Sequence, residues 1–247
     1  MINIDTLTQQ QLDQCAEAAS LLWQRGWAER NGGNLMLRLE SSTSIAHNLE
    51  DAPLIDSGVS SPHLAGMLFY VKGKSCRMRT LAQEPLSGGC IIEICPDGRH
   101  YHILSKSSIV PTSELSAHLM LHEDMVCNGK GYRASLHTHP TNLIALSHLT
   151  EQEQLQSSLT DILHSMLPEA RLFCPKGISW VPVLEPGSLQ LAECTVQALK
   201  QHDICLWAKH GVCAIGPDLI EAFDTVDIME KAADIYLRLR SAIPRGQ

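Results

Sequence analysis

The fold is decided by the stretch Ala134-Ser135-Leu136-His137-Thr138-His139-Pro140-Thr141-Asn142, near the middle of the chain. Residues 134–139 are predicted to form a strand, and Pro140-Thr141-Asn142 is expected to start a helix around residues 143–148. Residues two apart in a strand point to the same face. His137 and His139 are therefore expected to present both imidazoles on one side, with Thr138 on the other.

Outward from this stretch, helical and strand patterns alternate irregularly. Apolar residues at three- and four-residue steps predict helices at 5–27, 111–126, 157–166, 190–200 and 218–237. Short apolar or alternating runs predict strands at 35–39, 67–71, 90–95, 100–104, 171–173, 179–183, 203–208 and 212–215. Residues 41–65 are interpreted as an irregular connection within one domain. The mixture favours a layered α/β or α+β fold with a mixed sheet.

Composition excludes several classes of function. The chain has 247 residues, long enough for a hydrophobic core without disulfide bonds, and a formal net charge of −8. Nonspecific nucleic-acid binding needs many basic contacts, so this charge balance argues against it, while a phosphorylated small substrate needs only a local cluster of donors. The chain has no Gly-x-Gly-x-x-Gly fingerprint and no Walker loop, which argues against dinucleotide and nucleoside-triphosphate chemistry.

The nine cysteines favour a reducing compartment. Their number is odd, and no pair has Cys-x-x-Cys spacing, so reduced packing residues are expected rather than disulfides or a thiolate zinc site. The first residues do not resemble a signal peptide, and no run approaches the roughly 20 apolar residues that a membrane span requires. A cytoplasmic protein is the resulting expectation.

The histidines indicate a metal site. A catalytic zinc site needs three protein ligands and an open position. His137 and His139 supply two, and His210, beside Gly211, is the best candidate for the third. Chance pairs do occur among 12 histidines, and His100 with His102 is another.

A helical alternative lies in the predicted helix 111–126. Glu114, His118 and His122 follow one another at four-residue steps and could form a metal-binding face. On a helix, such a polar row is expected more often to be a solvated or interface stripe.

Four segments together resemble the class II sugar-phosphate aldolases, a family that also contains 4-epimerases and adducin-like proteins. They are Gly26-Trp27-Ala28-Glu29-Arg30-Asn31-Gly32-Gly33-Asn34, Val110-Pro111-Thr112-Ser113-Glu114-Leu115 with His118, His137-Thr138-His139-Pro140-Thr141-Asn142-Leu143-Ile144-Ala145-Leu146, and His210-Gly211-Val212 followed by Gly216-Pro217. The resemblance implies a single three-layer α/β/α domain, residues 1–247, around a largely antiparallel sheet. It also implies a homotetramer with sites at subunit interfaces.

The resemblance assigns roles to residues. His137, His139 and His210 would hold Zn²⁺ or another divalent ion, and Glu114 would be the acid/base residue. Glu169 would act in a neighbouring subunit's site. The phosphate pocket would contain Gly33, Asn34, Gly73, Thr112 and Ser113. Family members usually carry Thr-Gly-Ser/Thr-Gly where this chain has Lys72-Gly73-Lys74-Ser75, so Lys72 either contacts phosphate or points to solvent.

The implied reaction is retro-aldol cleavage of a ketose 1-phosphate. The four segments are most similar to those of members that split L-rhamnulose 1-phosphate into dihydroxyacetone phosphate and L-lactaldehyde. A Lewis-acid ion would stabilise the enediolate without a Schiff-base lysine. Two alternatives stay open: an aldolase or 4-epimerase acting on another ketose phosphate, such as L-fuculose 1-phosphate or L-ribulose 5-phosphate, and a non-catalytic scaffold.

Overall fold

A nine-stranded sheet runs through the molecule in the computed structural model, which describes residues 5–40, 53–104 and 108–242. Neighbouring strands pair antiparallel, except the parallel pair β7–β8. The order across the sheet is β2 (Ile55–Asp56), β5 (His100–Ile103), β4 (Gly89–Ile94), β3 (Leu68–Lys72), β1 (Asn34–Leu39), β6 (Ala134–Thr138), β9 (Gly211–Gly216), β8 (Ile204–Trp207) and β7 (Ser179–Val181). The expected mixed α/β fold around a largely antiparallel sheet is confirmed.

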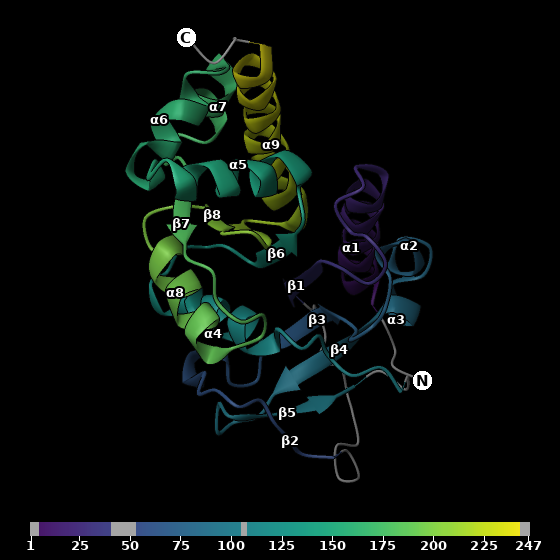
Figure 1. Cartoon of the computed structure of the whole chain (residues 1–247). Coiled ribbons are helices and arrows are strands. Elements are labelled where there is room, and N and C mark those ends of the chain that lie inside the picture. The colour runs from purple at the N-terminus through teal and green to yellow at the C-terminus, as the bar shows by residue number, and fades with distance from the viewer. Residues whose placement is uncertain (1–4, 41–52, 105–107, 243–247) are drawn as a thin grey trace.

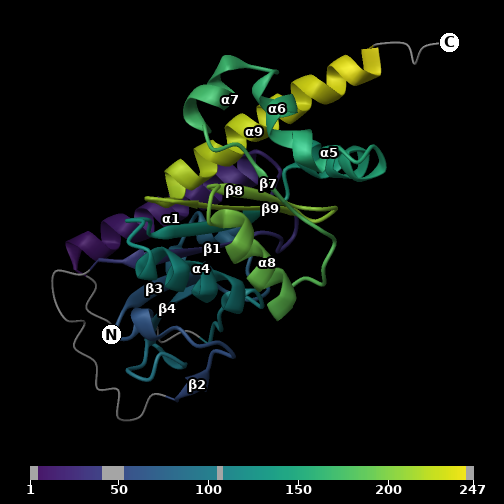
Figure 2. The ribbon, with the colours of Figure 1, turned by 90° about the vertical axis from the view of Figure 1, so that its left-hand side faces the viewer.

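Helices cover both faces of this sheet and complete three layers (Figure 1). One face carries α1 (Thr6–Gln24), α2 (Met78–Leu81), α3 (Pro85–Gly88), α5 (Thr141–Gln152), α6 (Leu159–His164), α7 (Pro168–Phe173) and α9 (Leu219–Ala242). The other carries α4 (Leu115–Cys127) and α8 (Leu189–Leu199). Figure 2 shows β8 and β9 between these two helical layers. None of the helices in the described ranges combines the length and low polarity that crossing a bilayer requires.

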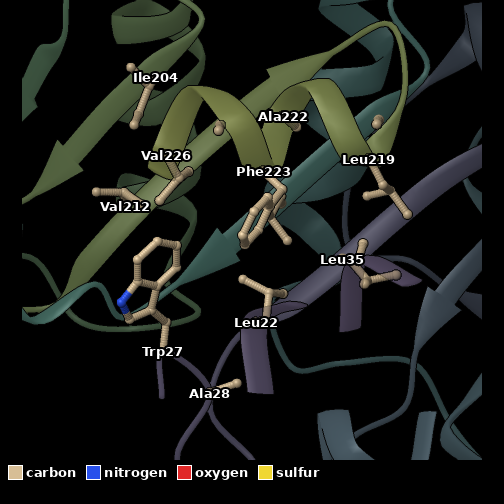
Figure 3. Close-up of a cluster of buried hydrophobic side chains, with 14 of the residues drawn as sticks. Leu22, Trp27, Ala28, Leu35, Ile204, Val212, Leu219, Ala222, Phe223 and Val226 are labelled. Carbon is tan, nitrogen blue, oxygen red and sulfur yellow. The ribbon is translucent and has the colours of Figure 1, made fainter. Parts of the chain in front are cut away.

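Strand alternation separates the core from the site. Buried apolar side chains form clusters on both faces of the sheet, and the larger core lies on the face covered by α1 and α9. In β6, Leu136 points into this larger core, while Ser135 and His137 point to the opposite face. Figure 3 shows the labelled side chains of Trp27 and Phe223 in this larger core. Their ring centroids lie 5.7 Å apart. Burying a side chain of this size contributes roughly 1.5–3 kcal/mol. Apolar packing therefore occupies one face of β6 and leaves the other face for polar groups.

Two predicted elements differ from the structure. The predicted strand 171–173 is wrong: these residues are the end of helix α7, which starts with Pro168 at its first position. A short apolar run does not distinguish a strand from a buried helical turn. The helix predicted from Pro111 begins only at Leu115, because Pro111 instead forms a β-bridge with Gly73.

The connecting segments also contain elements that the sequence did not predict. They are β2, the 3₁₀ turn Pro62–Leu64, α2 and α3. Of the segment 41–65, which was predicted to be irregular, residues 41–52 lie outside the described ranges.

Helix α5 follows directly after the His-x-His segment, and a distant carboxylate anchors its start. Its own cap residue, Pro140, makes no side-chain cap bond. Glu230 of α9 instead accepts hydrogen bonds from the backbone N–H groups of Asn142 and Leu143, both at 2.8 Å, and from the Asn142 side chain at 3.0 Å. Negative charge at a helix N-terminus is stabilising. Helix α9 thereby fixes the chain direction immediately beyond His139.

Replacing Glu230 with alanine is expected to lower the free energy of unfolding by about 1–3 kcal/mol, because the freed N–H groups lose their buried acceptor. Urea denaturation measures this loss. Glu230→Gln keeps one acceptor oxygen and should lose less. Equal stability of wild type and Glu230→Ala would show that water replaces the carboxylate without penalty.

Candidate active site

Three histidines converge at one end of the central strands. His137 lies near the end of β6, His139 follows that strand, and His210 lies in the turn between β8 and β9. The Nε2 atoms of His137 and His139 are 3.2 Å apart, and one ligand atom from each of the three residues lies within 4.8 Å of the others. Segments more than seventy residues apart in the chain thus meet as predicted.

Close backbone approach makes this convergence possible. A Cβ atom on Gly211 would lie 2.4 Å from the carbonyl oxygen of Thr138 and 3.0 Å from ring atoms of His137 and His139. Any side chain there would push the two strands apart. The indole of Trp207 stacks on His137 with ring centroids 4.4 Å apart, which fixes the plane of that imidazole.

Hydrogen bonds direct the imidazoles. The Nδ1–H of His137 donates to the carbonyl of Val212 at 2.8 Å, and the Nδ1–H of His139 donates to the carboxylate of Glu29 at 2.6 Å. In neutral rings, both Nε2 atoms then carry lone pairs. The pKa of His137 lies well below its usual value, mainly because the ring is buried and, to a lesser extent, because His139 and His210 are close to it. This lowered pKa keeps the ring neutral.

A divalent ion fits this donor set. Two lone pairs 3.2 Å apart repel each other unless a cation lies between them. Tetrahedral zinc with Zn–N bonds of about 2.0–2.1 Å would separate its nitrogen ligands by about 3.3 Å. Nδ1–H bonds to a carbonyl and a carboxylate are also the usual outer partners of metal-binding histidines.

Glu114 lies beside the histidines, where the chain enters α4. Its side chain is buried, its Oε2 atom is 3.9 Å from the Nε2 of His137, and it accepts a hydrogen bond of 2.8 Å from the amide of Asn34. The expectation of a solvated stripe along α4 is wrong: His118 and His122 are only 2% and 0% exposed, because α4 packs this face against the sheet.

A cavity of about 240 Å³ opens in front of these groups. Glu114 and the three histidines line it, together with all of the predicted phosphate residues: Gly33, Asn34, Gly73, Thr112 and Ser113. The lining also includes Asn31, Gly32, Lys74 and Ser75, which had no assigned role in the sequence, although their proximity to Gly33 and Gly73 was a signal. Hydroxyl, amide and ammonium donors are therefore gathered in the same cavity as the histidines.

Lys72 belongs to this cavity and not to the solvent. It is 2% exposed, and its Nζ donates to the carbonyl of Asn31 at 3.0 Å. Burial lowers the pKa of Lys72 to about 8, against weaker opposing effects of Cys76 and Glu114. With the described part of the chain it makes this one hydrogen bond, so the ammonium keeps further N–H groups for a ligand.

Two other sequence candidates lie apart from this cavity. Glu169 is an exposed residue in the first turn of α7 and does not line the cavity. His100 is bonded to Asp97 at 2.6 Å, and His102 to the carbonyl of Pro53 at 3.2 Å. Within the described ranges, the second His-x-His pair joins no group that could hold an ion.

A second cavity, of about 530 Å³, borders the same histidines. It is lined by His139 and His210 together with Gly26, Glu29, Thr141, Ile144 and Lys209. The histidine cluster is thus accessible from two cavities.

The fold and the site together define a mixed α/β protein with a potential metal centre beside a buried carboxylate. Residues 13–237 match the family model described as Class II Aldolase and Adducin N-terminal domain. The chain belongs to this family; it is a class II aldolase, a lyase, and such enzymes are generally metal-dependent.

Individual relatives agree with this assignment. A rhamnulose-1-phosphate aldolase of Bacteroides thetaiotaomicron is 41% identical over 234 residues, 94% of this chain and 86% of the relative. One of Salmonella heidelberg is 35% identical over 232 residues, 91% and 83% of the two chains. The crystal structure of a sugar-phosphate aldolase from Thermotoga maritima superposes with a TM-score of 0.82 at 33% identity, covering 97% of this chain and 98% of that one.

Replacing His139 with alanine is expected to abolish tight binding of Zn²⁺, because two imidazoles cannot fill the site. Equilibrium dialysis followed by metal analysis measures this, with an equimolar amount of ion expected in the wild type. His148→Ala removes an exposed histidine of α5 and serves as the matched control. Equal zinc content in His139→Ala and wild type would refute this ligand set.

Proposed function

We propose that the protein cleaves L-rhamnulose 1-phosphate into dihydroxyacetone phosphate and L-lactaldehyde, with the whole chain, residues 1–247, acting as one class II aldolase domain. Relatives that bear the name rhamnulose-1-phosphate aldolase, matched over most of their length, support this substrate. The observation that carries the proposal is a buried carboxylate facing three convergent imidazoles, at the edge of a cavity rich in anion donors.

The cavity suggests how the substrate is oriented. The phosphate would bind among Gly33, Asn34, Gly73, Thr112 and Ser113, where backbone N–H groups and hydroxyls suit an anion. Lys72 would add a positive charge to the same pocket. This orientation would place the substrate's carbonyl end near His137, His139 and His210, and direct the leaving aldehyde toward the second cavity.

We propose Zn²⁺ as the ion held by the three histidines. When bound, it would supply Lewis-acid stabilisation of the negative charge that develops on substrate oxygen as the C3–C4 bond breaks. Glu114 would accept the proton of the C4 hydroxyl and later return a proton to C3, so that one carboxyl group serves both steps. Its position 3.9 Å from His137 supports this role.

We also propose a cytoplasmic homotetramer whose sites lie at subunit interfaces. The nine free cysteines support a reducing compartment. On α7, Leu172 and Phe173 are 70% and 63% exposed, an apolar surface suited to a neighbouring subunit. Glu169, in the same helix, would then reach the neighbour's site rather than its own.

Release of dihydroxyacetone phosphate from L-rhamnulose 1-phosphate tests the proposal. The zinc-loaded protein is expected to release it, and a chelator should abolish the release until the ion is restored. Separate analysis of the sugar phosphates detects a 4-epimerase product. Absence of dihydroxyacetone phosphate with the fully loaded protein would contradict the proposed reaction.

Glu114→Gln provides the matched control for this assay. The amide keeps the size of the carboxylate but cannot take a proton, so zinc content should stay constant while kcat falls roughly 100-fold or more. Undiminished turnover would assign the proton transfers to another group.

Lys72 has an expected pH signature. Because the pKa of Lys72 is lowered to about 8, the free enzyme loses this charge as the pH rises through that value, and kcat/KM should decline toward that of Lys72→Ala. At pH 7 the alanine variant should show a KM raised about 10- to 100-fold, the scale of a lost charged hydrogen bond. An unchanged KM in Lys72→Ala would exclude a phosphate contact.

A further inference from the structure

A series of buried polar side chains continues behind Glu114, away from the cavity. The amide of Asn34 bonds Glu114 at 2.8 Å, and its oxygen bonds the Nε2 of His118. The Nδ1 of His118 is 2.6 Å from the hydroxyl of Ser135. Asn34, His118 and Ser135 are 5%, 2% and 0% exposed, so these groups depend on one another for hydrogen bonds.

The Glu114 carboxylate determines which group donates and which accepts in the hydrogen bonds of this series. An ionised Glu114 can only accept, so the NH₂ group of Asn34 must face it. The carbonyl oxygen of that amide then faces His118, and it requires a donor there. The Nε2 atom of His118 must therefore carry the proton.

The hydrogen bond between His118 and Ser135 has its donor and acceptor determined in the same way. Burial lowers the pKa of His118 to about 4, against the opposing charge of Glu114, so the ring is neutral and has one N–H group. With that proton on Nε2, the Nδ1 atom accepts the hydroxyl proton of Ser135. The oxygen of Ser135 can still accept from the Nε2 of His122, 3.1 Å away. Three donors, from Ser135, His118 and Asn34, thus point in sequence toward Glu114.

We propose that His118 is a positioning residue: through Asn34, it holds the Glu114 carboxylate in the orientation that proton transfer requires. This inference rests on the proposed role of Glu114. Without the Nε2–H donor, the oxygen of the Asn34 amide loses its partner, and the amide loses the second hydrogen bond that fixes its position against Glu114. Misplacement of a reacting group by about 1 Å can reduce turnover roughly 100-fold.

Two amide substitutions of His118 separate this role from simple packing. The longer side chain of the His118→Gln variant places an N–H group close to the position of the imidazole Nε2, whereas the shorter side chain of the His118→Asn variant reaches only the position of Nδ1. His118→Asn can therefore still bond Ser135 but not Asn34. We expect His118→Asn to lower kcat about 10- to 100-fold with zinc content unchanged, and His118→Gln to restore most of the lost turnover.

A double-mutant cycle with Glu114→Gln completes the test. If His118 acts through Glu114, His118→Asn should have little further effect on kcat in the Glu114→Gln background. An equal loss in both backgrounds, or equal turnover of His118→Asn and His118→Gln, would overturn the inference. Inactive wild-type protein would instead overturn the proposed function itself.

Ser135→Ala keeps the inference testable if His118→Asn fails to fold. Loss of the hydroxyl removes the hydrogen bond at the Nδ1 atom of His118, so the ring keeps only its bond to Asn34 and its position is less firmly fixed. We expect kcat to fall several-fold with zinc content unchanged. Wild-type kcat in a folded Ser135→Ala would count against the positioning role. Thermal unfolding of each variant shows whether it is folded.

Discussion

Antiparallel pairing of β6 with β1 on one side and β9 on the other is the constraint on which the site depends. The register places His137 opposite Asn34 in β1 and opposite Cys213 in β9, and His210 immediately precedes β9. Side chains alternate between the two faces of a strand, so a slip of one residue would turn His137 into the apolar core. The hydrophobic packing of Leu136 beneath α1 and α9 thus also determines where the imidazole points.

The sequence predicted the convergence of the three histidines better than it predicted their surroundings. His-x-His in a strand, and a third histidine beside a glycine, follow from local geometry, and the structure does bring these three side chains together. The partners that direct the rings, the carbonyl of Val212 and the carboxylate of Glu29, depend on strand pairing and loop path. Neither is encoded in the local periodicity.

The predictions that were wrong or left open for α4 and Lys72 have a common physical cause. The row of Glu114, His118 and His122 looked like a solvated helix face because polar residues at four-residue steps usually are. It is buried because Asn34 and Ser135 supply hydrogen bonds from the strands beneath. The two possible positions of Lys72 could not be separated in the sequence either, since a lysine at the end of a strand points to solvent or to a pocket according to its neighbours. In both cases, the burial of this helix face and the position of Lys72, the outcome depends on tertiary contacts that a local sequence pattern does not contain.

Asn34 links the two halves of the site. Its amide has one acceptor oxygen and two donor hydrogens. His118 uses the oxygen and Glu114 uses one hydrogen, so one N–H remains for the cavity that Asn34 also lines. Aspartate would place a second negative charge beside Glu114, and an apolar residue would leave both Glu114 and His118 without their partner. The same side chain therefore serves the carboxylate and borders the cavity, so the proposed phosphate-binding and proton-transfer functions cannot vary independently at this position.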